Sequence, residues 1–281
     1  MDSFANQTAV VTGAGGTLCS VIAEHLARRG CKVVLVGRTE EKLLKTAAKI
    51  DAFGGKYMIA PCDVTDEAGM TALAAKVLGT FGPCRFLING AGGNNIKAMT
   101  TNFVYDEREL TADKPEDMRC FFDIQMPDFE SVLKINTMGT VIAVKAFAPQ
   151  MIGNGGGAVL NFASMNSYRP LTRVLAYAMS KAAICNLTQW LATYFAPAKV
   201  RVNAVAPGFF VNERSKQYLG TVEEGLTQRG KNVISHTPQG RFGEPEDLLG
   251  TVDYLLDDAL SSFVTGITVP VDGGFLSHSG I

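Results

Sequence analysis

The stretch NFASMNSYRPLTRVLAYAMSK, residues 161–181, contains Ser164, then Tyr177 thirteen residues later, then Lys181 four residues after that. Tyr177 and Lys181 are four residues apart, so on a helix they share one face. Free tyrosine, with a pKa near 10, exchanges protons poorly at neutral pH, and a nearby ammonium favours its phenolate. We therefore expect Tyr177 to act as acid and base, with its pKa lowered by Lys181. Ser164 would donate a hydrogen bond to a substrate carbonyl, although a serine after a strand is also often a helix cap.

A glycine cluster follows the first apolar run, in VVTGAGGTLCS, residues 10–20. Gly13, Gly15 and Gly16 lie between a predicted strand and a predicted helix, where a phosphate would meet unpaired N–H groups. The spacing G-x-G-x-x-G would need glycine at position 18, which is Leu18. Taken alone, this cluster is as typical of a plain turn as of a nucleotide loop.

Short β-branched runs alternate with helical patterns along the chain, and these elements must position the reactive residues. The runs are apolar almost throughout, as in parallel strands covered on both faces. They comprise residues 8–12, 32–36, 56–60, 85–89, 158–163, 200–206 and 266–271. Between the first two, an apolar helical stripe runs from Leu18 to Leu26, with Gly30 as the expected C-cap. The repeated strand–helix–strand units predict a single α/β domain over residues 1–281, a Rossmann-like doubly wound parallel sheet with helices on both faces.

Two long irregular segments interrupt this alternation. Residues 92–127 are polar and irregular, and so long an inserted loop in a compact domain is usually functional or locally disordered. Residues 207–245 are also irregular, and we expect them to form a mobile segment that closes over a ligand.

Composition excludes several classes of function. The chain is 47% hydrophobic and 19% charged with a net charge of -1, which gives no basic field for nucleic acid or an anionic membrane. The first residues lack an export signal, and no apolar run reaches about 18 residues, so we expect a cytoplasmic protein. The six cysteines are scattered without metal-ligand spacing, which predicts free thiols, no disulfide and no metal site.

Further motifs strengthen the nucleotide interpretation. LINGAGG (87–93) ends a strand in a glycine-rich turn, SVLKINTMGT (131–140) places Asn136 on a helix, and VDGG (271–274) closes the last strand. With the serine, tyrosine and lysine, these motifs resemble the short-chain dehydrogenase/reductase family over essentially the whole chain. That family's loop is T-G-x-x-x-G-x-G, in which Thr17 and Cys19 here replace the second and third glycines. Thr17 would either hinder the phosphates or donate a hydrogen bond to them, and Cys19 is small enough to let helix and strand approach.

The resemblance implies an NAD(P)-dependent oxidoreductase and assigns further roles. Lys181 would also hold the nicotinamide ribose, and Asn136 would hold a water leading from Lys181 to solvent. A mid-helix asparagine can also serve only in packing or hydrogen bonding. Asp63 would meet the adenine edge. In the turn after the sixth strand, Phe210 and Asn212 stand where the family often has isoleucine and threonine. The expected cofactor contacts are Gly13, Gly15, Gly16, Thr17, Leu18, Arg38, Asp63, Val64, Asn89, Ala91, Gly92, Tyr177, Lys181, Pro207, Gly208 and Phe210.

The end of the second strand bears on the choice of nicotinamide. An acidic residue there would accept the adenosine ribose hydroxyls, whereas an arginine accommodates a 2′-phosphate. Gly37 takes the acidic position and Arg38 follows, which favours NADP(H). NAD(H) stays possible through Glu40 or Glu41, and Arg38 could be only a solvated cation.

More narrowly, SMNSYRPLTRVLAYAMSKAAICNLTQWLA, APGFF and GRFGEPEDLLG resemble the D-mannonate oxidoreductase (fructuronate reductase) group within the short-chain family. This implies a keto sugar acid such as D-fructuronate as substrate and D-mannonate as product. Arg169 is the preferred partner of the carboxylate because a guanidinium can grip it bidentately, unless it only pairs with a neighbour. Asn94, Asn95, Lys97 and Asn166 are candidates for the hydroxyls or carboxylate.

Two other functions stay open. One is a gluconate 5-dehydrogenase-like or other polyol or ketone reductase. The other is a nucleotide-sensing binding protein without turnover, against which Ser164, Tyr177 and Lys181 count. The resemblance also implies a homotetramer, with the helix of Tyr177 and the strand near Val269 at its interfaces.

Overall fold

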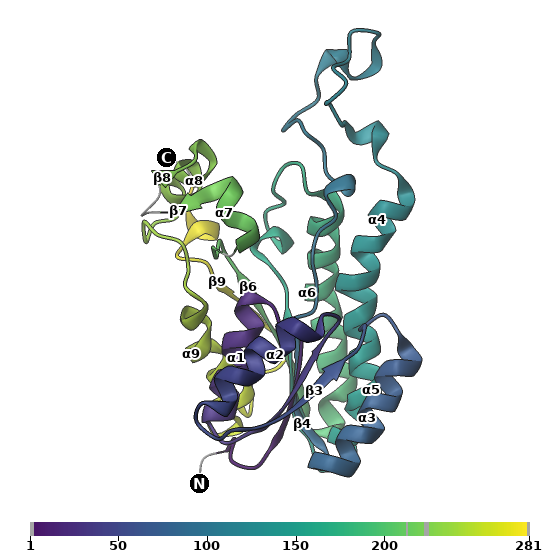
Figure 1. The fold of residues 1–281 in the computed structure, drawn as a ribbon, viewed down its shortest axis with the longest axis vertical. Coiled ribbons are helices and arrows are strands. Elements are labelled where there is room, and N and C mark those ends of the chain that lie inside the picture. The colour runs from purple at the N-terminus through teal and green to yellow at the C-terminus, as the bar shows by residue number, and fades with distance from the viewer. Residues whose placement is uncertain (1–2, 212, 222–224, 280–281) are drawn as a thin grey trace.

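Seven parallel strands form the central sheet of the computed structural model, which describes residues 3–211, 213–221 and 225–279 (Figure 1). All seven predicted strands are present, with ends within two residues of the predicted ones. They are β1 (Thr8–Thr12), β2 (Lys32–Gly37), β3 (Lys56–Pro61), β4 (Cys84–Asn89), β5 (Gly157–Phe162), β6 (Val200–Pro207) and β9 (Thr268–Val271). Their order in the sheet is β3-β2-β1-β4-β5-β6-β9, which confirms the predicted doubly wound fold.

The strand order reverses next to β1, whose two neighbours are β2 and β4. Thr12 pairs with Val36 on one side and with Asn89 on the other, so the carboxyl ends of these strands lie level. In open parallel sheets, ligands bind outside the carboxyl ends of the strands at such a reversal. The glycine turn after β1 therefore lies where a nucleotide would be expected.

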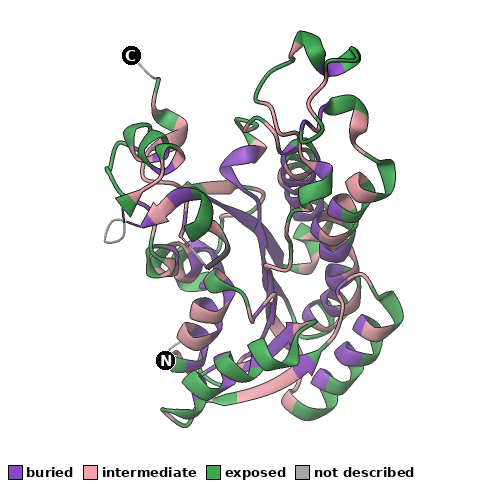
Figure 2. Ribbon diagram, turned by 45° about the horizontal axis from the view of Figure 1, so that its top comes forward, coloured by how far each residue is buried: buried purple, intermediate pink, exposed green. Residues whose placement is uncertain are grey.

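Helices cover both faces of the sheet, as its apolar strands require. On one face lie α1 (Thr17–Arg28), α2 (Glu40–Asp51) and α9 (Leu249–Leu256). On the other lie α3 (Glu67–Phe81), α5 (Gly139–Gly153) and α6 (Leu175–Phe195). Successive residues of β1 point to opposite faces, so Val11 packs in the first core and Val10 in the second. Figure 2 shows the sheet as the buried centre of the molecule.

Helix α1 follows the predicted stripe, with Ile22 and Leu26 fully buried. It ends at Arg28 with Arg29 as its C-cap, and Gly30 follows at φ +85°. The observed cap is thus one residue before the predicted one, Gly30. Its left-handed conformation is the one that commonly terminates helices.

The segment predicted to be an irregular insertion contains three short 3-10 helices, Ile96–Ala98, Glu107–Leu110 and Phe121–Asp123. It projects beyond the carboxyl edge of the sheet, next to α4 (Met126–Leu133) (Figure 1). A π-helical turn, Lys134–Met138, joins α4 to α5. The resulting continuous helix, Met126–Gly153, has the length and composition of a membrane span, but Val144, Phe147 and Met151 pack it against the sheet as a core helix.

The segment predicted to cover a ligand also has structure. It contains α7 (Glu213–Leu219), the short antiparallel pair β7 (Gly220–Thr221) and β8 (Gly225–Leu226), and α8 (Gln228–Ser235). Asn212, singled out in the sequence, lies outside the described residues. A 3-10 helix (Pro245–Leu248) precedes α9, α10 (Asp258–Ser261) follows it, and 3-10 helices also occur at Met165–Ser167, Ala196–Ala198 and Phe275–Ser277. Figure 1 shows α7 and α8 on the opposite side of the carboxyl edge from α4.

Candidate functional site

Ser164 and Tyr177 meet where β5 ends and α6 begins. Ser164 is 5% exposed, and its hydroxyl caps the 3-10 helix Met165–Ser167 by accepting a hydrogen bond from the N–H of Asn166 at 3.2 Å. The Ser164 hydroxyl also acts on the phenol of Tyr177, whose pKa it lowers. The geometry of Ser164 therefore matches the helix-cap interpretation, and its role at a reactive centre stays a prediction.

Lys181 lies one turn beyond Tyr177 on α6, with Nζ 5.7 Å from the centre of the Tyr177 ring. The side chain is buried, and Nζ donates a hydrogen bond to the carbonyl of Phe162 at 2.6 Å. Burial lowers the pKa of Lys181 to about 8, because an ammonium is poorly solvated there. At neutral pH, which lies below this value, most of the amine is still protonated and charged.

The expectation that Lys181 lowers the pKa of Tyr177 is wrong for the protein's own side chains. Burial raises the pKa of Tyr177, and hydrogen bonding by Ser164 is what opposes this rise. The ammonium of Lys181 is directed to the carbonyl of Phe162. Desolvation of the phenolate therefore outweighs the attraction that the spacing suggested.

Asn136 lies in the π-helical turn between α4 and α5, 1% exposed. Its Oδ1 accepts a hydrogen bond from the N–H of Gly93 at 2.8 Å, and its Nδ2 donates to the Gly93 carbonyl and to Ser180 Oγ, both at 2.9 Å. Both donors of the amide are therefore used by the protein, as a hydrogen-bonding role requires. This side chain ties the turn after β4 to α6.

Gly92 lies between these groups, in the turn expected to line the nicotinamide. A Cβ at this position would be 2.5 Å from Asn136 Oδ1 and 3.6 Å from Lys181 Nζ. The position therefore accepts only glycine, and the backbone here approaches the catalytic candidates closely. The N–H of Ala91, its neighbour, donates to Thr12 Oγ1 at 3.1 Å, which joins this turn to the end of β1.

Asn89 heads a buried polar chain that sequence reasoning missed. Its Nδ2 donates to Asn161 Oδ1, and Asn161 Nδ2 donates to Thr188 Oγ1, each at 2.9 Å. Asn89 Oδ1 is buried without a hydrogen-bond partner among the described residues. The signal for this chain was present, since Asn161 is a polar residue within the apolar run AVLNFA.

The glycine loop lies against the turn after β4. Gly13 has φ +70°, and a Cβ on it would be 2.8 Å from the carbonyl oxygen of Gly90. A Cβ on Gly15 would be 2.6 Å from Cβ of Lys42, and Gly16 precedes the first turn of α1 without a side-chain cap. The loop thus leaves the N–H groups of the first turn, at Thr17 and Leu18, without a capping side chain, as a phosphate site requires.

Cys19 stands at the position of the third glycine in the family's loop pattern, and its contacts show how the loop accommodates a side chain there. Its side chain is buried, and a Cβ on Gly90 would be 2.0 Å from Cys19 Sγ. At this contact the cysteine side chain lies on the helix, and the residue without a side chain lies on the facing turn. Burial raises the pKa of Cys19 to about 12, which leaves the thiol protonated. All six cysteines are free.

Arg38 and Asp63 follow β2 and β3 at the same edge of the sheet. Arg38 Nη1 is 3.9 Å from Asp63 Oδ2, and the two side chains are 65% and 39% exposed. Partial burial would raise the pKa of Asp63, but two hydrogen bonds from Thr65 and the charges of Arg38 and Lys134 lower it overall. Val64 is buried against Gly139, so its side chain serves packing.

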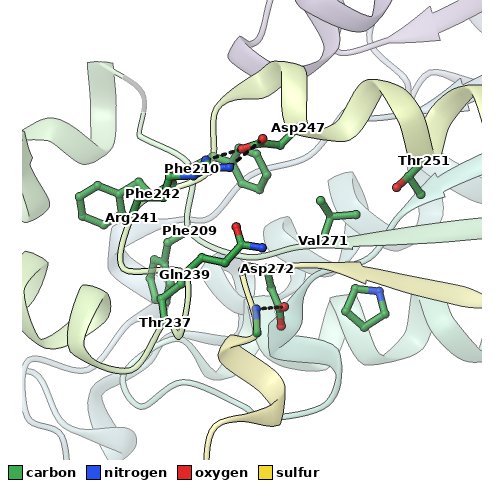
Figure 3. A pocket seen from close by; sticks show the side chains of 14 residues that line it. Phe209, Phe210, Thr237, Gln239, Arg241, Phe242, Asp247, Thr251, Val271 and Asp272 are labelled. Atoms are coloured by element: carbon green, nitrogen blue, oxygen red, sulfur yellow. Dashed lines mark hydrogen bonds and ion pairs between the residues drawn. The ribbon is translucent and has the colours of Figure 1, made fainter.

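Pro207 ends β6 and Gly208 follows it, where a Cβ on Gly208 would be 2.7 Å from Cα of Asp272. Phe210 is buried, and its ring fills the space beside Gly243. Residues of this region line a cavity of about 390 Å³, with the Arg241–Asp247 ion pair in its wall (Figure 3). Ser164, Tyr177 and Lys181 are not among its lining residues.

Of the candidate substrate residues, Asn166 lies next to Ser164, whereas the asparagines of the insertion and Arg169 are bonded to other parts of the protein. Asn95 Nδ2 donates to Asp128, its Oδ1 accepts from the N–H of Lys97, and Asn94 Oδ1 accepts from the N–H of Asn95, so these amides organise the insertion. Asn166 is buried beside Ser164, with Oδ1 accepting from the N–H of Leu171 at 2.9 Å. The guanidinium of Arg169 is exposed and donates to the carbonyl of His278 at 2.9 Å.

Comparison with known proteins identifies related chains over the full length. The short chain dehydrogenase family model matches residues 7–220. The chain is 41% identical over 280 residues to the uncharacterized oxidoreductase UxuB of Bacillus subtilis (strain 168), a match covering 100% of this chain and 98% of that protein. It is 30% identical over 273 residues to the 2-dehydro-3-deoxy-D-gluconate 5-dehydrogenase of Dickeya dadantii (strain 3937), covering 97% and 96% of the two.

Two solved structures are similar as well. A proposed D-mannonate oxidoreductase from Haemophilus influenza with bound NAD superposes with a TM-score of 0.92 at 40% identity, covering 99% of this chain and 97% of that chain. A proposed NAD(P)-dependent gluconate 5-dehydrogenase from Beutenbergia cavernae, with NADP bound at low occupancy, gives a TM-score of 0.79 at 30% identity, covering 97% and 98%.

Proposed function

Because the chain belongs to the short-chain dehydrogenase family, we propose that it is an NAD(P)-dependent oxidoreductase that interconverts D-fructuronate and D-mannonate. The observation that carries this proposal is the group of Ser164, Tyr177 and Lys181 at the carboxyl edge of the sheet, in which Ser164 and Lys181 are buried and Tyr177 is partly buried. The D-mannonate oxidoreductase activity proposed for the similar Haemophilus protein supports the substrate.

Reduction of a ketone needs a hydride on carbon and a proton on oxygen. When bound, the reduced nicotinamide supplies the hydride. Tyr177 donates its phenolic proton to the carbonyl oxygen, and Ser164 hydrogen-bonds that oxygen as its negative charge develops. The phenolate that remains then takes a proton from solvent, and Lys181, whose Nζ donates to the carbonyl of Phe162, lies one turn further along the same helix. Asn136 fixes the turn at Gly93 and, through Ser180, the helix that carries both groups.

The loop after β1 fits a dinucleotide by its own geometry. Its glycines lie in tight contacts and the first turn of α1 lacks a side-chain cap. We propose that this turn binds the pyrophosphate, that Asp63 and Arg38 bind the adenosine end, and that Gly92 and Gly208 flank the nicotinamide. The exposed guanidinium of Arg38 supports a preference for NADP(H), with NAD(H) as an alternative favoured by the NAD-bound similar structure.

The test is a steady-state assay of the purified protein with NADPH and NADH. We expect D-fructuronate to be reduced, followed as loss of nicotinamide absorbance. Failure with both coenzymes across a panel of uronates and ketogluconates would contradict the substrate. Reduction of a ketogluconate alone would favour the second candidate, a gluconate 5-dehydrogenase-like enzyme, which the Dickeya relative supports. Cofactor binding without turnover of any ketone would favour a nucleotide-sensing protein.

We also propose a cytoplasmic homotetramer. Trp190 and Tyr194 support it, because they stack on α6 with ring centres 4.9 Å apart yet are 59% and 63% exposed. Exposed aromatic residues of this kind are typical of protein interfaces. The molecular mass in solution, measured by light scattering, tests this point.

A further inference from the structure

Two arginines that the proposed reaction does not use lie beside the site. Arg173 is in the turn between β5 and α6, four residues before Tyr177, and Arg229 is in the first turn of α8. We propose that Arg173 and Arg229 together bind the carboxylate of the substrate and so select keto acids over neutral ketones. This inference rests on the proposed reduction of a keto sugar acid.

Contacts along α8 place it beside the turn that carries Arg173. At the C-terminal end of α8, the ring of His236 meets the ring of His278 with centres 5.4 Å apart. The carbonyl of His278 in turn accepts the hydrogen bond from Arg169, in the same turn as Arg173. At the other end of α8, Arg229 is near enough to Arg173 for the two positive charges to repel.

Arg173 is held in a fixed position by the insertion. Its Nε donates to the carbonyl of Thr100 at 3.0 Å, its guanidinium carbon lies 5.5 Å from the centre of the Phe103 ring, and the N–H of Thr100 donates to its carbonyl at 3.1 Å. Its φ of +75° is unfavourable for a residue with a side chain. Such strained residues cluster at ligand sites, where the surrounding structure holds them in place.

Arg229 carries a positive charge that nothing described in the protein neutralises. It is half-buried and forms no ion pair or hydrogen bond with the residues that the structure describes. The first turn of α8 contains no acidic residue, although the positive end of a helix dipole favours one. Burial and the charge of Arg173 both lower the pKa of Arg229, which reflects the same unfavourable surroundings. A bound anion would relieve all three effects.

The carboxylate is the charged group of a keto sugar acid, and it suits a position between two guanidinium groups. In a keto sugar acid, the ketone and the carboxylate are joined by a chain of hydroxylated carbons, so the ketone can reach Tyr177 while the carboxylate is held away from it. Two guanidinium groups can bind both carboxylate oxygens. Arg169, the first choice from sequence, is exposed and donates to His278, so we assign the carboxylate to Arg173 and Arg229 instead.

The test compares Arg229→Gln and Arg173→Gln with wild type on D-fructuronate and on the neutral ketose D-fructose. We expect each variant to raise KM for D-fructuronate by about tenfold or more, the usual effect of losing a charge-assisted hydrogen bond, with kcat nearly unchanged. The rate with D-fructose, however small, should not fall. Arg229→Lys should recover part of the lost affinity. Lys231→Gln, which removes an exposed charge from the same helix, is the matched control and should change neither substrate.

Each outcome separates this inference from the proposed function. Wild-type turnover of D-fructuronate with an unchanged KM in Arg229→Gln overturns the assignment of the carboxylate and leaves the proposed function standing. Equal losses with both substrates also overturn it, because they indicate a general structural role. A wild-type enzyme that reduces neutral ketones but no keto acid overturns both. The coenzyme affinity of each variant and the melting temperature of Arg229→Gln are expected to match wild type, which excludes misfolding as the cause.

Discussion

The end of the site that holds Tyr177 and the end that holds Arg38 lie on one edge of the sheet but are built differently. Ser164, Lys181 and Asn136 are at most 6% exposed, and each is hydrogen-bonded to the protein within 3.2 Å. At the other end, Arg38 is 65% exposed and its nearest carboxylate, on Asp63, lies 3.9 Å away. An exposed pair at that distance contributes little to stability.

This difference indicates what each end has to do. The proposed proton transfer depends on positions fixed to fractions of an ångström, and burial with several bonds per side chain provides that. Recognition of a phosphate or a ribose hydroxyl tolerates an exposed, movable side chain. We therefore expect substitutions at the buried end to abolish turnover and those at the exposed end to redirect coenzyme choice.

The largest expected effect is that of Tyr177→Phe. Removing the phenolic proton should lower kcat by a factor of about a hundred or more, because general acid catalysis contributes that much, while coenzyme still binds. Turnover with D-fructuronate and a fluorescence titration with NADPH measure the two effects. A rate close to wild type would exclude Tyr177 as the proton donor.

Next in size is the pH dependence of stability that the buried Lys181 imposes. Its pKa is about 8 in the folded protein, below the ordinary value of 10.5, so between these two values the unfolded chain holds a proton that the folded chain lacks. Stability from this group therefore rises with pH across that window and is lowest below about pH 8. Between about pH 8 and pH 10.5, the free energy of unfolding of wild type, measured with urea, should rise by roughly 3 kcal/mol relative to that of Lys181→Met. A constant difference between the two proteins would contradict the lowered pKa.

A smaller effect tests the packing of the altered glycine loop. Gly90→Ala would place Cβ 2.0 Å from Cys19 Sγ, and overpacking of this kind costs about 1–3 kcal/mol in the free energy of unfolding. Cys19→Gly should restore much of the loss in the double variant. Gly79→Ala is the matched control, because nothing lies within 4 Å of its Cβ and alanine is favoured within α3, so it should stabilise by about 0.5–1 kcal/mol. Equal effects of the two alanine substitutions would contradict the account of Cys19.

The smallest expected effect is at the exposed end. Arg38→Asp should shift the ratio of kcat/KM for NADPH and NADH toward NADH by about tenfold, because an acid repels the 2′-phosphate and accepts the ribose hydroxyls. Lys49→Gln, a charge change on the neighbouring helix α2, should leave this ratio unchanged. An unaltered ratio in Arg38→Asp would show that Arg38 does not contact the phosphate.

The same contrast explains what could be predicted from sequence. The seven strands and the pairing of Tyr177 with Lys181 are written in local patterns, namely apolar runs and a four-residue spacing on one helix. Ser164 stands in the same stretch of sequence, and the family resemblance added Asn136 to that site. Local patterns do not contain the contacts between distant segments. They therefore missed the chain from Asn89 through Asn161, the contact of Cys19 with Gly90, and the approach of Arg229 to Arg173.

The prediction that the pKa of Tyr177 is lowered was wrong for a related reason. The spacing places an ammonium nearby, but the direction of Lys181 Nζ is set by the carbonyl of Phe162, and the desolvation of Tyr177 is set by the packing around it. Neither is visible along the chain. Arg169 is similar, because its partner His278 lies 109 residues away in sequence.

The most direct test of the account is a crystal structure of the protein with bound nicotinamide coenzyme. We expect the pyrophosphate at the first turn of α1, the adenosine beside Arg38 and Asp63, and the nicotinamide ring facing the hydroxyl of Tyr177. A coenzyme bound elsewhere, such as in the cavity beside Phe209, or a nicotinamide ring out of reach of Tyr177, would contradict the proposed chemistry.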